Sequence, residues 1–331
     1  MASGLWRWPL LDNQRPADIS PFMALPIVHH HDYDAESVPD SHRFPMRKYS
    51  LLADLLRARG ETFAVPAHAP EHWLHLAHDP SYVTAVLTSS VDARTARKIG
   101  FEMTPAIAAR TRASVGGTCL AARLAVEHGA AVNLAGGSHH ASYEGGAGFC
   151  VFNDVAVAAR VALEEGLCQK VAVIDCDVHH GDGTASIFAS DDRVFTASLH
   201  CDDNWPRIKP PSDLDVGLSK GATDSDYLQA LDRFLKSVFS QSKPGLVFYN
   251  AGVDPHEKDR LGLLSLSDEG LRERDRRVAE TCIRNGVPIV GVLGGGYEKD
   301  ARAVARRHSF MVDALAAATA PQGRTAFSSP Q

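Results

Sequence analysis

The sequence predicts an α/β protein in which a mostly parallel sheet is covered by helices on both faces, giving three layers. Short apolar runs rich in β-branched residues, which are typical of buried strands, alternate with longer segments of helical spacing. Clusters of polar residues directly follow several of these runs. Ligands of open α/β sheets bind outside the carboxyl ends of the strands, so we expect these clusters to meet at one binding edge.

The alternation indicates six strands and six helices. The runs expected to form strands are residues 25–29, 130–134, 171–175, 194–199, 246–250 and 288–293. The segments expected to form helices are residues 49–59, 112–127, 155–165, 226–239, 268–285 and 301–318.

The length of 331 residues allows one large domain or two smaller ones, and the lack of a convincing interdomain linker favours one. We expect this domain to span residues 24–318. An extension at residues 1–23 would precede it, and a disordered tail at residues 319–331 would follow it.

Charge and composition argue against several classes of partner. The net charge of −6 disfavours direct binding to nucleic acid, and no apolar run is long enough to cross a membrane. The N-terminus lacks the sustained apolar stretch of a secretory signal. The six cysteines form no CxxC pair, so we expect reduced thiols in a cytoplasmic protein. The pattern gives no indication of the oligomeric state.

The segment VAVIDCDVHHGDGT (171–184) carries the strongest indication of function. It begins as a buried strand and then places Asp175, Asp177 and His179 at alternate positions, where side chains share a face. Acids and imidazoles beside a buried strand need partners, and a divalent metal ion would supply one. A helix cap formed by Asp182 is the alternative for part of the run. Because a cap does not explain so many polar groups together, we expect a metal or catalytic site.

Two adjacent histidines, His139 and His140, follow the predicted strand at 130–134. The carboxylates of Asp175 and Asp182 are candidates to hydrogen-bond their rings and fix the tautomers. A His–Asp pair beside a metal-bound water has the groups of a general base. A turn residue with a satisfied ring remains the alternative for either histidine.

Two further clusters follow later strands. The loop after residue 250 contains Asp254, His256, Asp259 and Arg260. So polar a loop is usually solvated, and Asp259 would reach a metal only if the chain folds back. Tyr297 comes directly after three glycines in a run that lacks the GxxxxGK[ST] pattern of a phosphate loop. It could donate a hydrogen bond to a developing oxyanion, or pack as a surface aromatic at a helix start.

Taken together and in this order, the motifs resemble those of the zinc-dependent histone deacetylase family, which has the arginase–deacetylase fold. The matching segments are HRFPM (42–46), GGSHHA (136–141), GFCVFND (148–154), DCDVHHGDGT (175–184), DRLG (259–262) and GGGY (294–297). HRFPMRKY and PSDLDVGL (211–218) are most similar to class IV deacetylases and their bacterial relatives. The resemblance extends from about residue 25 to about residue 318. It implies one domain around a sheet of about eight parallel strands.

The resemblance implies a role for each matching residue. The zinc ligands would be Asp177, His179 and Asp259, with one Zn²⁺ per chain. The general base and acid would be His139 and His140, backed by Asp175 and Asp182, and Tyr297 would be the oxyanion donor. The implied substrate contacts are Gly148, Phe149, Gly295, Gly296 and Arg43, with Phe149 in the acyl-lysine tunnel and Arg43 beside an internal product channel. A structural K⁺ ion is implied at Asp175, Asp177, His179, Ser198 and Leu199.

The predicted activity is hydrolysis of acetyl or longer acyl groups on lysine side chains. The alternative keeps the chemistry but acts on acetylated polyamines or another small acylated amine. An arginase-like binuclear manganese enzyme and a non-enzymatic binding module fit the motifs less well. Iron(II) or cobalt(II) could occupy the same ligands.

The resemblance leaves the roles of two segments undecided. The segment after residue 200 lacks the Phe- and Gly-rich stretch of class I enzymes, which leaves Asn204 and Trp205 as candidates for the second tunnel wall. The His- and acid-rich loop at residues 29–42 is a solvated rim or a second metal site.

Overall fold

The structure is a computed structural model that describes residues 25–320. Seven strands form one sheet in the order β1-β2-β7-β6-β3-β4-β5, and every neighbouring pair is parallel. The strands are β1 (Ile27–Val28), β2 (Ala130–Asn133), β3 (Val171–Asp175), β4 (Val194–Cys201), β5 (Leu214–Leu218), β6 (Leu246–Asn250) and β7 (Ile289–Val292). The predicted class is confirmed. The sheet has one strand more than the residues alone indicated and one fewer than the resemblance implied.

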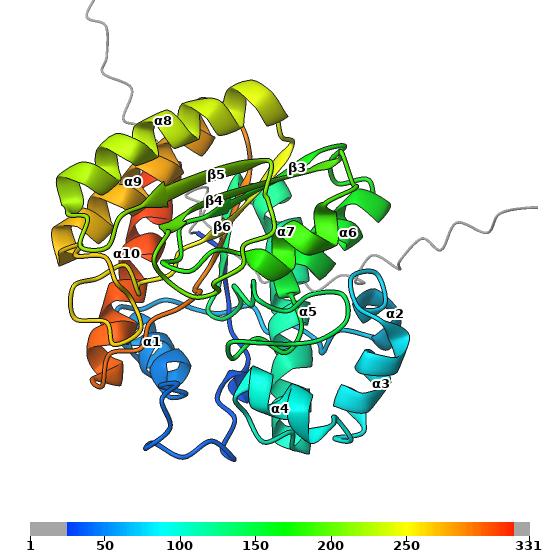
Figure 1. Cartoon of the computed structure of the whole chain (residues 1–331). Coiled ribbons are helices and arrows are strands. Elements are labelled where there is room, and N and C mark those ends of the chain that lie inside the picture. Colours follow the sequence, from blue (N-terminus) through cyan, green and yellow to red (C-terminus); the bar gives the residue numbers. More distant parts are fainter. Residues whose placement is uncertain (1–24, 321–331) are drawn as a thin grey trace, which may run out of the picture.

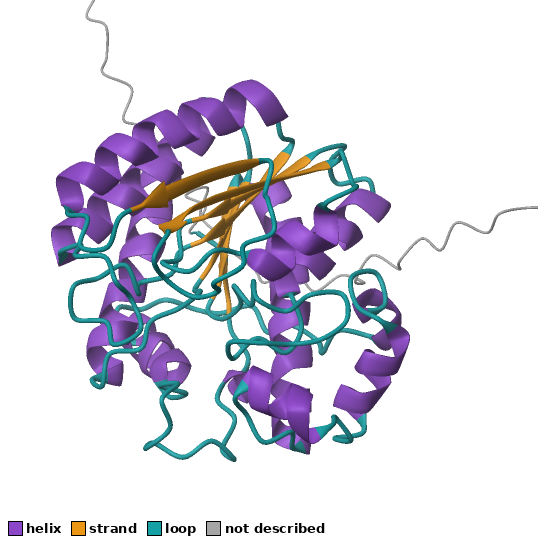
Figure 2. Ribbon diagram, viewed as in Figure 1, coloured by secondary structure: helices purple, strands orange, loops and turns teal. Residues whose placement is uncertain are grey.

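Helices cover both faces of the sheet (Figure 1, Figure 2). One layer holds α5 (Pro105–His128), α6 (Asp154–Glu164) and α7 (Asp182–Phe188). The other holds α1 (Lys48–Arg57), α8 (Asp224–Ser242), α9 (Asp268–Arg284) and α10 (Ala301–Thr319). Three short helices lie beside the lower part of α5 in Figure 1, namely α2 (Glu71–Leu74), α3 (Pro80–Leu87) and α4 (Ala93–Ile99). A 3-10 turn, η1 (His31–Tyr33), follows β1.

Local sequence signals explain where the long helices begin and end. Thr104 caps α5 by accepting a hydrogen bond from the backbone amide of Ile107 (3.3 Å), and Pro105 occupies the first turn. The helix ends at Gly129, whose left-handed conformation (φ 87°) suits glycine. Ser267 caps α9 in the same way, through the amide of Gly270 at 3.1 Å. The expected helices are confirmed, with shifts of a few residues at most ends.

The elements that the sequence pattern missed are short or lie at an edge. Strand β5 is the edge of the sheet, and its residues alternate between partly buried and exposed, with Asp215 and Gly217 among them. It therefore lacks the apolar run that marks the other strands. Helices α2, α3, α4 and α7 span four to eight residues, too few for a clear 3.6-residue period.

The ends of the predicted domain are only partly covered. The extension at residues 1–23 and most of the tail at residues 319–331 lie outside the described residues, although α10 still includes Thr319. Within residues 25–320, no helix is both long and apolar enough to cross a membrane. All six cysteines are free thiols.

Candidate active site

The polar clusters predicted to converge lie together at the carboxyl edge of the sheet. Strands β3 and β6 are neighbours, and Asp175 of β3 is opposite Asn250 of β6, whose side-chain amide donates to Asp175 Oδ1 at 3.1 Å. The glycine loop after β7 reaches the same place, because the amide of Gly295 donates to Asp177 Oδ2 at 2.7 Å. The histidines after β2 arrive there too, since His139 Nδ1 lies 2.7 Å from Asp175 Oδ2. The parallel sheet thus gathers four loops into one site.

Asp177, His179 and Asp254 form a buried group whose ligand atoms all lie within 4.8 Å of one another. His179 Nδ1 lies 3.0 Å from Asp177 Oδ1 and 3.1 Å from Asp254 Oδ2. Asp254 Oδ1 accepts a hydrogen bond from the amide of Val178 at 2.9 Å, which orients the carboxylate. One imidazole nitrogen and two carboxylates are a donor set that fits a catalytic zinc ion with a position left open.

Asp259, the third ligand that the resemblance implies, is not a member of this group, although its charge is near enough to raise the pKa of Asp254. Its role as a metal ligand stays a prediction. Asp259 Oδ1 accepts from the amides of Leu261 (2.8 Å) and Gly262 (3.0 Å), and Oδ2 accepts from the amide of Tyr297 (2.6 Å). These contacts shape the DRLG turn and hold the backbone of Tyr297, and they leave acceptor capacity on the carboxylate for a metal ion. Asp254 comes four residues after the end of β6, whereas Asp259 comes nine residues after it. Closeness to the strand end was the signal that could have identified Asp254.

The charges within this group need compensation. Burial, followed by the nearby Asp177 carboxylate, raises the pKa of Asp254 to about 7. Burial alone would lower the pKa of His179, but hydrogen bonds and charge from Asp177 and Asp254 outweigh it and raise the pKa to about 10. Burying the two carboxylates without a positive charge between them would be costly in free energy, and a divalent cation would supply that charge. The residues present therefore fit a metal ion of the zinc class.

Two His–Asp pairs flank the group. His139 Nδ1 lies 2.7 Å from Asp175 Oδ2, and His140 Nδ1 lies 2.6 Å from Asp182 Oδ1. Both carboxylates face Nδ1, so Nδ1 carries the proton in each ring and Nε2 is the nitrogen left for chemistry. The predicted backing of each histidine by its aspartate is confirmed. The alternative of Asp182 as a helix cap is not, because α7 has no side-chain cap.

The two imidazoles are adjacent, with ring centroids 4.0 Å apart, but differ in proton affinity. Burial opposes protonation of His139, yet the charges of Asp175 and Asp177 outweigh it and raise its pKa to about 9. Burial and the neighbouring His139 lower the pKa of His140 to about 4. A pair whose environments push the pKa values apart is suited to divide acid and base roles.

Tyr297 lies above the buried group at the end of the glycine loop. Burial, then the charges of Asp177 and Asp254, raise the pKa of its hydroxyl well above the usual value, so the phenol keeps its proton. Residue 295 of this loop has to be glycine, because a Cβ there would lie 2.1 Å from Asp254 Oδ2. The buried Nζ of Lys48 donates to the carbonyl of Gly294 at 2.8 Å and holds the loop from below. The sequence analysis did not single out Lys48.

A pocket of about 700 Å³ opens above the site. Phe149 lines one side, in a left-handed conformation (φ 67°) that its amide stabilises by donating to the carbonyl of Ile99 at 2.7 Å. Trp205 lines the other side, with its ring centroid 4.5 Å from that of His140. Gly148, Asn204 and Tyr297 complete the apolar and polar lining near the base. The predicted place of Phe149 and the suggested place of Trp205 both agree with this arrangement.

Arg43, which the resemblance places beside an internal product channel, is exposed and lines the mouth of the pocket. A small internal cavity of about 20 Å³ lies behind the site, and its lining includes Gly295, His139 and the buried Arg110. Arg110 donates to the backbone carbonyl of Tyr33 (3.1 Å) and to the Tyr49 hydroxyl (2.7 Å). The inner arginine therefore comes from α5, where no motif marked it.

The residues predicted for a monovalent cation lie on neighbouring segments. Ser198 of β4 is paired in register with Asp175 of β3, and Leu199 follows on β4. Ser198 Oγ lies 3.0 Å from His200 Nδ1, and His180 Nε2 lies 3.0 Å from Asp215 Oδ1. The second of these contacts ties the β3–α7 loop to the edge strand β5.

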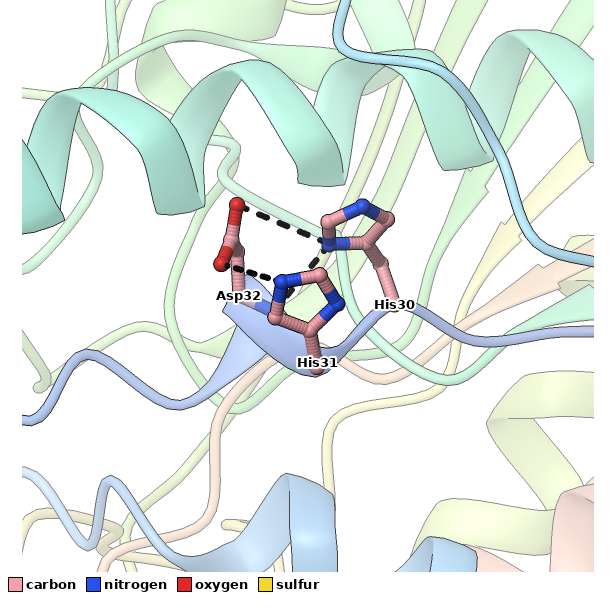
Figure 3. A group of neighbouring side chains, drawn as sticks. All are labelled: His30, His31 and Asp32. Carbon is pink, nitrogen blue, oxygen red and sulfur yellow. Dashed lines mark hydrogen bonds and ion pairs between the residues drawn. The ribbon is translucent and has the colours of Figure 1, made fainter.

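A separate polar group follows β1 (Figure 3). Asp32 lies between two histidines, with His31 Nε2 3.1 Å from Oδ1 and His68 Nε2 2.7 Å from Oδ2, and its amide donates to His30 Nδ1 at 3.1 Å. The side chain of His31 is 84% exposed. These contacts hold the turn η1 against the segment that carries His68. His30, His31 and Asp32 also lie close enough together to hold a metal ion, so the second metal site and the solvated rim both stay predictions.

Comparisons with known proteins agree with this site. The family model described as histone deacetylase domain matches residues 42–314. An uncharacterized protein of Picosynechococcus sp. is 46% identical over 293 residues, which cover 87% of this chain and 97% of that protein. Histone deacetylase 2 of Arabidopsis thaliana is 31% identical over 299 residues, covering 86% of this chain and 77% of that protein. A probable deacetylase of Methanothermobacter thermautotrophicus is 33% identical over 215 residues, covering 60% of this chain and 63% of that protein.

The fold is also found among solved structures. The crystal structure of the HDA15 HD domain superposes with a TM-score of 0.74 at 22% identity, over 88% of this chain and 90% of that chain. The chain therefore belongs to the histone deacetylase family. The family consists of deacetylases, which hydrolyse amides, and its members generally depend on zinc.

Proposed function

We propose that the protein is a zinc-dependent amidohydrolase that removes acetyl or longer acyl groups from lysine side chains. The observation that carries the proposal is the buried convergence of Asp177, His179 and Asp254 next to two His–Asp pairs, beside a pocket lined by His140, His179 and Tyr297. Asp177 and His179 would hold the metal ion, one per chain, together with Asp259, as the resemblance implies, or with Asp254 as the third ligand. Bound zinc supplies Lewis acidity, which polarises an amide carbonyl and lowers the pKa of water.

The protein's own residues account for the proton transfers. The Nε2 atoms of His139 and His140 point away from their aspartates, so one can accept a proton from the attacking water. The other can deliver a proton to the leaving amine nitrogen as its bond to the acyl carbon breaks. One amide and one water thus give one carboxylic acid and one amine. No covalent acyl-enzyme is required.

Tyr297 would stabilise the charge that develops on the acyl oxygen. Its neutral hydroxyl is a hydrogen-bond donor in a buried setting, where such an interaction is stronger than in water. Phe149 and Trp205 would exclude water and hold the aliphatic part of the substrate between them. The implied K⁺ ion at Asp175, Asp177, His179, Ser198 and Leu199 would have a structural role, since these residues anchor strands β3 and β4 next to the metal group.

The test is hydrolysis of a matched panel of acyl-lysine peptides, from acetyl to myristoyl, by zinc-loaded wild type and Tyr297→Phe. Turnover that depends on Tyr297 is the expected result, and the preferred chain length would measure the pocket. Metal content determined on the same samples separates loss of zinc from loss of the hydroxyl. Absence of turnover on every member, with zinc bound, would contradict the proposal for acyl-lysine.

A further inference from the structure

The mouth of the pocket carries two basic side chains, Arg43 and Lys98. They approach from different elements, because Arg43 precedes α1 and Lys98 lies in the last turn of α4. Both are exposed. The residues that line this pocket include no aspartate or glutamate. The entrance is therefore positively charged, although the chain as a whole has a net charge of −6.

Both basic residues are fixed to the walls of the pocket through their backbones. The carbonyl of Lys98 accepts a hydrogen bond from the amide of Gly148 at 3.0 Å, next to Phe149. The carbonyl of Arg43 accepts from Arg260 Nη2 at 2.8 Å, and Arg260 Nε donates to the carbonyl of Tyr297 at 2.5 Å. The backbone positions that carry these side chains are thus tied to the two sides of the catalytic pocket.

These charges lack neutralising partners in the part of the chain that the structure describes. Within residues 25–320, no ion pair within 4.0 Å involves Arg43, Lys98 or Arg260, although many other arginines are paired. The acids of the adjoining groove have other partners. Asp40 lies 3.6 Å from Arg47, Glu298 pairs with Arg307, and Asp300 caps α10.

From this arrangement we propose that the preferred substrate carries a carboxylate close to the acylated amine, and that polycationic amines are disfavoured. The proposal rests on the proposed function and narrows its substrate class. The carboxylate could belong to an acidic residue beside an acylated lysine in a peptide, or to the lysine itself when it is free. A polyamine would instead bring one or more ammonium groups to a mouth that already holds two cations, and like charges repel.

The expected size of the effect is modest, since the side chains are exposed. In water, a unit charge on the substrate about 4 Å from a unit charge on the protein changes the binding equilibrium by roughly fivefold. The change is larger where the mouth of the pocket is partly desolvated. The discrimination should weaken as salt is added, because the Debye length falls from about 10 Å at 0.1 M to about 3 Å at 1 M. This salt response separates charge recognition from a difference in shape.

The experiment compares kcat/KM for one acetyl-lysine peptide with acidic, neutral or basic flanking residues, together with free Nε-acetyl-lysine, its carboxamide and N-acetylspermidine. Wild type should prefer the acidic peptide to the basic one by about tenfold, with the neutral peptide between them. Lys98→Gln, which leaves only Arg43, should weaken this preference, and Lys98→Glu, whose carboxylate offsets the charge of Arg43, should abolish it. Lys236→Glu makes the same charge change on the exposed face of α8 and should keep the wild-type order.

The possible kinetic results distinguish the source of the carboxylate, this inference and the proposed function from one another. A preference of free Nε-acetyl-lysine over both its carboxamide and the peptides identifies the lysine's own carboxylate, whereas a preference for the acidic peptide identifies a protein substrate. Equal turnover of all peptides, or the highest turnover with N-acetylspermidine, would overturn the inference and leave the amidohydrolase proposal intact. The same response to Lys98→Glu and Lys236→Glu would also overturn it. Absence of turnover on every compound, with zinc bound, would instead count against the proposed function.

Discussion

The base and the mouth of the pocket are built in different ways. At the base, Asp177, His179 and Asp254 are buried, and each follows directly from the end of a central strand. At the mouth, Arg43, Lys98 and Trp205 come from loops and a short helix and are exposed to solvent.

The difference separates what determines the reaction from what determines the substrate. A buried charged group tolerates few changes, because removing one partner leaves another uncompensated. Exposed side chains can change at little cost to the fold. The base should therefore govern whether any amide is hydrolysed, and the mouth should govern which one. Four experiments test this division, and they are ordered from the largest expected effect to the smallest.

The largest effect is expected from Asp254→Asn. It removes a charge from the buried ligand group, so metal binding should fall and kcat/KM should drop by more than about 1,000-fold. Asp259→Asn makes the same change five residues away, at the third ligand that the resemblance implies, and should also lower the metal content. Metal analysis and kinetics on both variants would decide, because the variant that loses more metal identifies the third ligand. An unchanged metal content in both variants would contradict a metal ion held by either carboxylate.

Tyr297→Phe should be the next largest change. It removes one hydroxyl while leaving the ring and its contacts in place, so kcat should fall by about 100- to 1,000-fold and KM should change little. Metal content should equal that of wild type. An unchanged kcat would remove Tyr297 from the chemistry and leave it as a wall of the pocket.

His78→Gln tests whether the structure that supports the base of the pocket depends on a neutral histidine. His78 Nδ1 faces the carbonyl of Ser142 at 2.9 Å and must donate, while Nε2 accepts from the amide of Asn153 at 2.9 Å. Burial lowers its pKa from 6.5 to about 4. Because the folded state favours the neutral ring, its stabilising contribution is complete above about pH 6.5 and is lost as the pH falls towards 4.

Between pH 6.5 and pH 4, the titration of His78 should lower the free energy of unfolding by up to about 1.4 kcal/mol for each unit by which the pH falls. Urea unfolding at pH 7, 5.5 and 4.5 measures it. His78→Gln should be less stable at pH 7 but show a shallower pH dependence than wild type. Parallel curves for the two proteins would mean that other buried groups dominate the acid response.

The smallest effect is expected from Trp205→Ala at the mouth. Its loop is held by Lys209, whose Nζ donates to the carbonyls of Asp202 (2.9 Å), Asn204 (3.0 Å) and Pro206 (2.9 Å), so removal of the indole should widen the pocket without releasing the loop. We expect KM for acetyl-lysine to rise about tenfold with little change in kcat. Ile208→Ala, on the same loop but 84% exposed and outside the pocket lining, is the control and should behave as wild type. A large loss of kcat in Trp205→Ala would place the indole in the catalytic step.

The same division explains how much could be predicted from the sequence. The strands, the convergence of the polar clusters and the His–Asp pairs follow from alternation along β3 and from the geometry of parallel sheets, which are local rules. The place of Asp254 in the buried group was missed, because spacing in a loop does not reveal how the loop turns back. Arg110 was missed because burial of a single arginine depends on long-range packing. Strand β5 was missed because an edge strand needs no apolar run.

Strand β7, the last strand that the structure describes, lies in the middle of the sheet, so the sheet cannot be completed until this strand has been synthesised. Strand β7 is inserted between β2 and β6, and Ile289 pairs with Ala130, which precedes it by 159 residues. Until the ribosome has released residues 289–297, neither the sheet nor the glycine loop that carries Tyr297 can close. Contacts this distant in sequence form slowly, and the nascent chain meanwhile exposes unpaired edges on β2 and β6. Hydrolytic activity should therefore appear only after residues 289–297 have left the ribosome, and a chain that stops before β7 should be a target for chaperones.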